Sequence, residues 1–291
     1  MKRPSLIHPL LSLFLLLSLF VLSRLSAFET YPVWPDVPPG DSAEQYDNGT
    51  YTLPVLEWWS PENKTSDLCV IICPGGGYGG VAYEYEGVMP RDYYLSQGIT
   101  VVMLRYRVPR RAGVPKHQPA WQDLQRTVRF VRAHAEEWGI NPEKIGAQGF
   151  SAGGHLVLMG ATTSQTNAYE RVDAIDDLPC HLNFAVPIYP AYVLTDGADG
   201  ENANRGEGAA IVDDFAFDEK TPPMCLIHGD GDGYSALGSV AVYHRLRQMN
   251  IPGEIHIFAL VNHAWRNAPE DAPVRRYPER VRDWWIELGL L

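Results

Sequence analysis

Residues 149–153, GFSAG, place Ser151 between two glycines in the pattern G-x-S-x-G. A serine hydroxyl is a poor nucleophile unless the fold exposes it beside a base. A strand-like run, KIGAQGF, leads into the motif, and a helix-like run, SAGGHLVLMGATTS, follows it. A sharp strand-to-helix turn in that setting exposes the hydroxyl near the positive end of a helix. The alternative is an accidental match with Ser151 as a helix N-cap, but the context favours a nucleophilic serine.

A nucleophilic serine needs a base, and the base needs a carboxylate that orients it. His263 follows the predicted strand EIHIFAL, while Asp230 and Asp232 follow the predicted strand PMCLIHG. These side chains should meet Ser151, because the carboxyl ends of parallel strands lie at one edge of a sheet. The residues alone leave the choice of acid open, since the carboxylate nearer the strand end could instead bond turn amides. Five other histidines fit the role of base less well, and most of them are interpreted as packing or surface residues: His117, His155, His181, His228 and His256.

The glycine-rich stretch CPGGGYGG at residues 73–80 allows two interpretations. Its glycines fit the G-x-G-x-x-G fingerprint of a dinucleotide site, or they let backbone N–H groups face the oxyanion of acyl transfer. A dinucleotide site expects an acid at the end of the next strand. That strand ends in RYRVPRR, and the chain has no acidic residue between Asp92 and Asp123. Only an oxyanion loop also uses the serine, acid and histidine, so the sequence favours it.

The elements that must position these residues alternate along the chain. Predicted strands cover residues 68–73, 99–107, 144–150, 182–190, 223–229 and 254–260, and predicted helices cover 84–97, 121–138, 151–164, 236–249 and 275–288. Repeated alternation of this kind predicts an α/β fold, a mostly parallel sheet with helices on both faces. Residues 194–220, rich in Gly, Asp and Asn, are predicted to form a loop between strands, because their acidic spacing does not fit a calcium loop.

The first 27 residues have the layout of a secretory signal peptide, with two basic residues before an apolar run from Leu10 to Leu22 and small residues at the end. An uncleaved membrane anchor is the alternative, but the run is shorter than the ~20 residues that a spanning helix needs. We expect a secreted or periplasmic protein with no stable membrane partner after cleavage. An extended arm at residues 28–50 then precedes a single domain at residues 51–291.

Charge and cysteine usage exclude several classes of partner. Cleavage would change the formal net charge from −11 to −14, because the segment holds three basic and no acidic residues. Such a surface repels phosphate backbones, so we expect no nucleic acid partner. Cys69 and Cys73 lie in one predicted strand ~13 Å apart, too far for a disulfide, and all four cysteines are interpreted as free thiols. No C-x-x-C pair or close Cys/His cluster indicates zinc.

Taken together, these motifs resemble the α/β-hydrolase esterases, and specifically the bacterial group related to acetylxylan esterases and feruloyl esterases (BD-FAE-like). The resemblance runs from about Leu68 to His263. It rests on PGGGY after the first core strand, on the stretch from YRVPRR to GFSAGGHL, and on HGDGD and NHAW. It implies the α/β-hydrolase fold, with the acid of H-G-x-x-D as its last residue, Asp232. The sequence departs from many relatives near the base, where Val261–Trp265 replaces a Gly-Gly-His-Gly-type segment.

The same resemblance implies an oxyanion loop and a reaction. PGGGY stands where esterases of the HGGG type carry their loop, with Pro74 in place of the histidine. The implied oxyanion donors are the N–H groups of Gly76, Gly77 and Ala152. The implied catalytic residues are Ser151, Asp232 and His263, with no metal or organic cofactor.

The implied substrate is a carboxylic ester, small or on a polysaccharide. Short acyl groups such as acetyl on xylan fit an exported enzyme with this resemblance. Tyr78, Tyr234 and Trp265 flank the three loops and are candidate substrate contacts, although aromatic residues also serve as loop anchors and core fillers. The alternatives are a serine amidase or peptidase, because the fold alone does not choose the acyl group, and a non-catalytic binding protein on a hydrolase scaffold.

Overall fold

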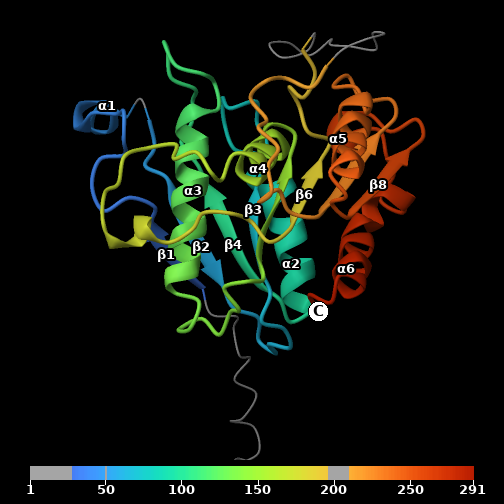
Figure 1. Cartoon of the computed structure of the whole chain (residues 1–291), viewed down its shortest axis with the longest axis horizontal. Coiled ribbons are helices and arrows are strands. Elements are labelled where there is room, and N and C mark those ends of the chain that lie inside the picture. The colour runs from blue at the N-terminus through green and yellow to red at the C-terminus, as the bar shows by residue number, and fades with distance from the viewer. Residues whose placement is uncertain (1–27, 50, 196–209) are drawn as a thin grey trace, which may run out of the picture.

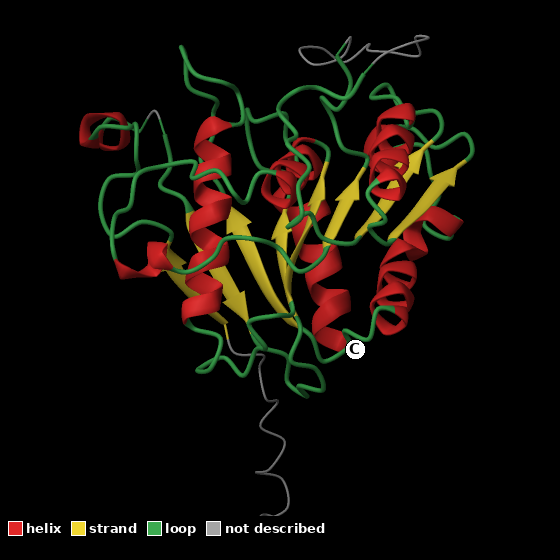
Figure 2. Ribbon diagram, in the orientation of Figure 1, coloured by secondary structure: helices red, strands yellow, loops and turns green. Residues whose placement is uncertain are grey.

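A computed structural model describes residues 28–49, 51–195 and 210–291. The predicted signal peptide at residues 1–27 and much of the predicted loop at 194–220 lie outside the described residues. An eight-stranded sheet runs through the middle of the molecule, with helices on both sides of it (Figures 1 and 2). This is the mostly parallel α/β architecture that the sequence predicts.

The strands lie in the spatial order β1-β2-β4-β3-β5-β6-β7-β8. Every neighbouring pair from β4 to β8 is parallel, whereas β2 runs antiparallel to both β1 and β4. The bounds are β1 Phe28–Pro32, β2 Val55–Trp59, β3 Cys69–Cys73, β4 Thr100–Arg105, β5 Ile145–Phe150, β6 Ala185–Ile188, β7 Met224–Gly229 and β8 Gly253–Phe258.

Helices α3, α4 and α5 pack on one face of the sheet, and α2 and α6 pack on the other. The helical bounds are α1 Ala43–Asp47, α2 Met89–Ser96, α3 Gln118–Ala133, α4 Ala152–Thr162, α5 Leu237–Gln248 and α6 Tyr277–Glu287. A π-helical segment at Tyr83–Val88 leads directly into α2. Short 3₁₀ turns occur at Ala174–Asp177, His263–Trp265 and Pro273–Arg276.

Strand β3 illustrates why the central strands are uniformly apolar. Cys69, Ile71 and Cys73 join the core cluster beneath α3 and α4, while Val70 and Ile72 join the cluster beneath α2 and α6. All five side chains are fully buried. A parallel strand covered on both faces has no solvent side, so its sequence shows no polar alternation. This sandwiched position fixes the end of β3, from which the glycine-rich loop begins.

The N-terminal arm is more structured than the sequence predicts. Residues 28–32 form β1, an edge strand paired with β2, and β2 itself was absent from the predicted strands. Asp41 forms buried ion pairs with Arg107 and Arg111. The Trp34 indole N–H donates to the Asp123 carboxylate at 2.7 Å. These contacts join the arm to α3 and to the segment that follows β4.

The remaining predicted elements are present, with their ends shifted by a few residues. The four cysteines are free and buried, as the sequence predicts. Within the described residues, no helix combines the length and the apolar character that a membrane crossing requires.

Candidate active site

Ser151 lies at the turn between β5 and α4, with backbone angles of φ 52° and ψ −117°. A positive φ is uncommon for a residue with a side chain, and surrounding contacts must hold it. The Ser151 N–H donates to the Ile188 carbonyl at 3.0 Å, and the Ser151 carbonyl accepts from the Ala191 N–H at 3.1 Å. The strand, turn and helix around this serine are therefore the context that the G-x-S-x-G pattern predicts.

The two outer glycines of the motif are required by close backbone contacts. A Cβ atom on Gly149 would lie 2.1 Å from the Gly153 carbonyl oxygen, and a Cβ on Gly153 would lie 2.0 Å from the Cys73 carbonyl oxygen. Side-chain atoms do not approach backbone oxygens so closely. Only glycine at both positions lets β5, α4 and the end of β3 meet around Ser151.

Gly153→Ala is expected to lower the free energy of unfolding by about 1–3 kcal/mol, because the added methyl must push apart α4 and the end of β3. The midpoint of urea unfolding measures this loss. Gly80→Ala is the matched control, since a Cβ there meets nothing within 4 Å. Equal midpoints for the two variants would show that the close contact at Gly153 does not exist.

Three side chains from separate loops form one chain of hydrogen bonds. Ser151 Oγ lies 2.8 Å from His263 Nε2, and His263 Nδ1 lies 2.8 Å from Asp232 Oδ2 and 2.9 Å from Oδ1. An ionised carboxylate can only accept hydrogen bonds, so the proton sits on Nδ1 and leaves Nε2 to accept from the serine. The geometry is that of a nucleophile, a base and an orienting acid.

The carboxylate of this chain is Asp232, which only the family resemblance had separated from Asp230. Asp232 is almost fully buried and also accepts the Tyr234 N–H at 2.8 Å, whereas Asp230 is exposed. Burial raises the pKa of the Asp232 carboxyl, but hydrogen bonds and charge from His228 and His263 outweigh it, so the pKa lies below its usual range. The carboxylate therefore stays ionised at neutral pH.

The loop after β3 lies against Ser151. A Cβ on Gly75 would lie 2.9 Å from the Ser151 Cβ, and Gly76 and Gly77 have φ angles of 131° and 63° that favour glycine. Among the described residues, no protein acceptor bonds the N–H groups of Gly76 and Gly77. The Ala152 N–H begins α4 and has no partner within the helix. Three donors beside the serine hydroxyl are thus available to a ligand.

The family model described as BD-FAE matches residues 56–236, which is more than half of the chain. The chain belongs to the BD-FAE family. The matched region of this BD-FAE protein holds Ser151, Asp232 and the glycine-rich loop, and it ends before His263.

Relatives of this BD-FAE protein include esterases. An acetylxylan esterase of Xylanibacter ruminicola is 27% identical over 211 residues, which cover 68% of this chain and 40% of that protein. The chain thus spans about two fifths of that relative's length. The acetyl ester-xyloside bifunctional hydrolase of Caldicellulosiruptor lactoaceticus has a similar structure, with a TM-score of 0.72, 26% identity and coverage of 90% of this chain and 97% of that one. An α/β hydrolase from a Medee basin deep-sea metagenome library has a similar structure, with a TM-score of 0.67, 22% identity and coverage of 91% of this chain and 99% of that one. The fold of this chain is the α/β-hydrolase fold.

Glu86 connects two sides of the BD-FAE site, and no sequence motif marks its role. Its side chain is buried, with Oε2 accepting the Gly75 N–H at 2.6 Å and Oε1 accepting the Tyr189 hydroxyl at 2.9 Å. Burial raises the pKa of this carboxyl, and the hydrogen bonds from Tyr189 and Gly75 oppose that rise. The Tyr189 ring in turn packs edge-on against the His263 ring, with centroids 5.1 Å apart. One carboxyl group therefore holds both the glycine loop and the ring that supports the histidine.

Glu86→Gln is expected to lower kcat for ester hydrolysis about 10- to 100-fold with little change in KM, because an amide has a single acceptor oxygen for two donors and the loop N–H groups shift. Rates are divided by the number of reactive serines, counted with a serine-directed phosphonate, so that loss of folded protein does not contribute. Glu84→Gln is the control, since Glu84 is exposed two residues away. A kcat per reactive serine equal to that of the control would contradict this role.

The structure separates the three candidate substrate contacts. Tyr78 and Trp265 are each 1% exposed, and both belong to core clusters. Neither offers a ring face to a substrate, because Tyr78 points its hydroxyl at His155 and Trp265 packs on Tyr189. Tyr234 remains a candidate contact, since it is only half-buried and its ring centroid lies 4.9 Å from that of His263.

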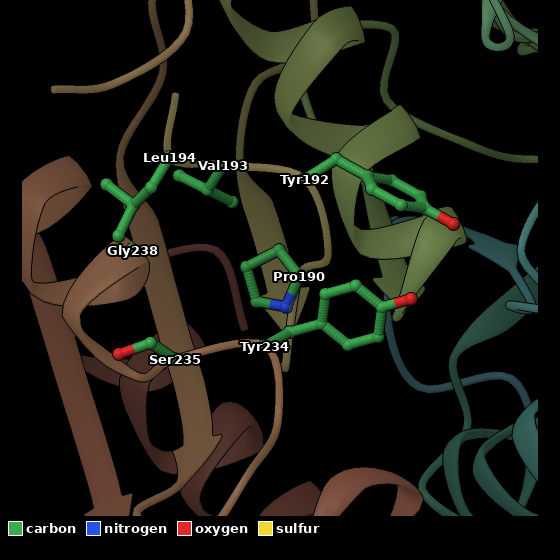
Figure 3. Close-up of a pocket in the computed structure, with 7 residues that line it drawn as sticks. All are labelled: Pro190, Tyr192, Val193, Leu194, Tyr234, Ser235 and Gly238. Carbon is green, nitrogen blue, oxygen red and sulfur yellow. The ribbon is translucent and has the colours of Figure 1, made fainter. Parts of the chain in front are cut away.

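Tyr192, which the sequence analysis missed, forms a wall with Tyr234. Their ring centroids are 5.4 Å apart, and in Figure 3 the two hydroxyl groups point in the same direction. The Tyr192 hydroxyl lies 3.7 Å from where a Cβ on Gly77 would stand, so this wall borders the glycine loop. The pocket behind the wall has a volume of about 10 Å³, the space of roughly one water molecule.

Proposed function

We propose that this chain is a carboxylic ester hydrolase that acts through Ser151, His263 and Asp232. The observation that carries the proposal is the continuous hydrogen bonding from Ser151 Oγ through the His263 ring to the Asp232 carboxylate, each step at 2.8 Å. A histidine oriented in this way can remove the serine proton, and the ionised carboxylate stabilises the imidazolium that results.

In the first half of the reaction, Ser151 Oγ attacks the ester carbonyl while His263 Nε2 takes its proton. The carbonyl oxygen becomes an oxyanion and accepts hydrogen bonds from the N–H groups of Gly76, Gly77 and Ala152. Each donor of this kind contributes ~3 to 4 kcal/mol of transition-state stabilisation in other serine hydrolases. His263 then gives its proton to the leaving alcohol oxygen, and the ester C–O bond breaks to leave an acyl group on Ser151.

In the second half, water takes the place of the alcohol. His263 Nε2 accepts a proton from the water, whose oxygen attacks the acyl carbonyl beside the same N–H donors. The C–O bond to Ser151 breaks, the serine regains a proton from His263, and the carboxylic acid leaves. These steps use groups of the chain and one water molecule, and they close the catalytic cycle.

The proposed substrate is a short acyl ester, such as acetyl, on a polysaccharide such as xylan. The tyrosine wall, whose Tyr234 ring lies next to the His263 ring, supports a short acyl group. The acetylxylan esterase and the acetyl ester-xyloside hydrolase among the similar proteins support an acetylated sugar as the alcohol part. Secretion through the predicted signal peptide would bring the enzyme to such a substrate outside the cell.

The test measures release of p-nitrophenol from the acetate, butyrate and octanoate esters, with p-nitroacetanilide as an amide and acetylated xylan as a polymer. We expect kcat/KM to be highest for acetate, and we expect free acetate from the xylan. A faster reaction with the anilide would point to an amidase. No reaction with any ester would contradict the proposal.

A further inference from the structure

Three residues far apart in the sequence lie together beside the glycine loop, outside the proposed catalytic relay. His117 directly precedes α3, His155 lies in the first turn of α4, and Asp214 lies between β6 and β7 in the sequence. One ligand atom from each lies within 4.8 Å of the other two. His117 Nδ1 is 3.8 Å from Asp214 Oδ2, and the two imidazole rings have centroids 5.4 Å apart.

Each histidine of this cluster has one buried ring nitrogen that is unpaired among the described residues. Within the described part of the chain, His155 Nε2 and His117 Nδ1 have no hydrogen-bond partner. The His155 side chain is fully buried, and His117 is 6% exposed. Buried polar atoms are nearly always paired, so two orphaned nitrogens at one point call for an explanation.

The other nitrogen of His155 is already fixed. Its Nδ1 lies 2.8 Å from the Tyr78 hydroxyl, and Tyr78 belongs to the glycine-rich loop. When Nδ1 donates its proton to that oxygen, Nε2 presents its lone pair to the cluster. Metal-binding histidines commonly have their second nitrogen fixed by such a hydrogen bond. The buried Tyr78 side chain would therefore serve to orient the His155 ring.

We propose that His117 Nδ1, His155 Nε2 and the Asp214 carboxylate bind one zinc ion. Two imidazoles and a carboxylate are a ligand set that suits Zn²⁺, with water completing a tetrahedron on the exposed Asp214 side. Ligand atoms around zinc lie about 3.3 Å apart, and the exposed Asp214 side chain can move to close that distance. The nearby Lys116 ammonium, which lies over the Tyr192 ring at 4.4 Å, opposes a cation. Asp214 supplies the anionic ligand of the proposed set, so this carboxylate is essential for binding.

The ion would act as a structural tie and would not take part in ester hydrolysis. It would join the segment around Asp214 to α3 and α4. Through His155, it would also hold Tyr78 and the glycine-rich loop in place. A second cluster, Cys225 with Glu254 and His256, fits a metal less well. His256 Nε2 already bonds Glu254, and burial raises the pKa of the Cys225 thiol well above its usual range, so the thiol keeps its proton.

Zinc binding is tested by calorimetry on the untagged full chain, stripped with a chelator and dialysed. We expect one site per chain with a Kd of about 1 µM or tighter. Asp214→Asn should weaken binding by at least about 10-fold, and it should fold normally because Asp214 is exposed. Asp213→Asn, an exposed neighbour outside the cluster, should bind as the unchanged chain does. Equal affinities for the two asparagine variants would overturn the proposal, as would the absence of binding.

Two further measurements separate this site from other histidines. His256→Gln, which removes the second cluster, and His263→Ala should both keep the zinc affinity, whereas His117→Gln should lose it. Loss of binding only in His256→Gln or only in His263→Ala would overturn the assignment. Zinc at about 100 times its Kd should also lower the unfolding equilibrium constant about 100-fold, seen as a higher Tm that Asp214→Asn abolishes. This test needs no ester substrate, so it stands apart from the proposed function.

Discussion

Ser151→Ala is expected to lower kcat/KM for p-nitrophenyl acetate by about 10⁴- to 10⁶-fold, because no other hydroxyl occupies the strained turn beside His263. The methyl side chain leaves the turn intact, so the protein should fold and melt as before. A residual rate above that in water would come from the N–H donors of the glycine loop, which the substitution does not touch.

Initial rates at several ester concentrations, together with thermal unfolding, measure this effect. Ser96→Ala is the control, because Ser96 is an exposed serine at the end of α2 whose hydroxyl bonds the Tyr93 carbonyl and the Gln97 amide. It should retain the activity of the unchanged chain. A Ser151→Ala protein that is folded and retains more than about one hundredth of the activity would rule out Ser151 as the nucleophile.

His263→Ala is expected to cost nearly as much as Ser151→Ala, because a serine without its base has no acceptor for its proton. Substitutions of residues that act as a unit have non-additive effects on activity. The activity of the double variant should therefore be within a few-fold of that of either single variant. His244→Ala, at an exposed position of α5, serves as the control. If the fold-loss of kcat/KM in the double variant equalled the product of the two single losses, the two side chains would act in separate steps.

The sequence predicted the central parallel strands and the serine turn well, because both follow from strong local patterns. β3 is apolar throughout because it is buried on both faces. The two G-x-S-x-G glycines are required because a Cβ atom at either position would lie about 2 Å from a backbone oxygen. β1 was missed for the opposite reason. Edge strands such as β1, with its mostly exposed residues, carry little hydrophobic signal and form through pairing with a distant partner.

The site was predictable where motifs carry it and not where only tertiary packing does. The residues alone did not distinguish Asp230 from Asp232, because the loop conformation that buries one carboxylate depends on contacts with the segment after β8, such as the hydrogen bond from the Gly231 N–H to the Val261 carbonyl. Glu86 and Tyr192 reach the site from segments with no motif. Tyr78 and Trp265 were expected near a substrate, yet their side chains turn into the core, and spacing along the chain does not encode that direction.

The most direct test of the account is covalent labelling of the full chain with a fluorophosphonate, followed by intact mass and peptide mapping. A phosphonate reacts with a serine only when a neighbouring base activates it. We expect one adduct per chain, located on Ser151. It should be absent in Ser151→Ala and form much more slowly in His263→Ala. An unlabelled protein, or an adduct on a different residue, would contradict the assignment of Ser151 and His263 as nucleophile and base.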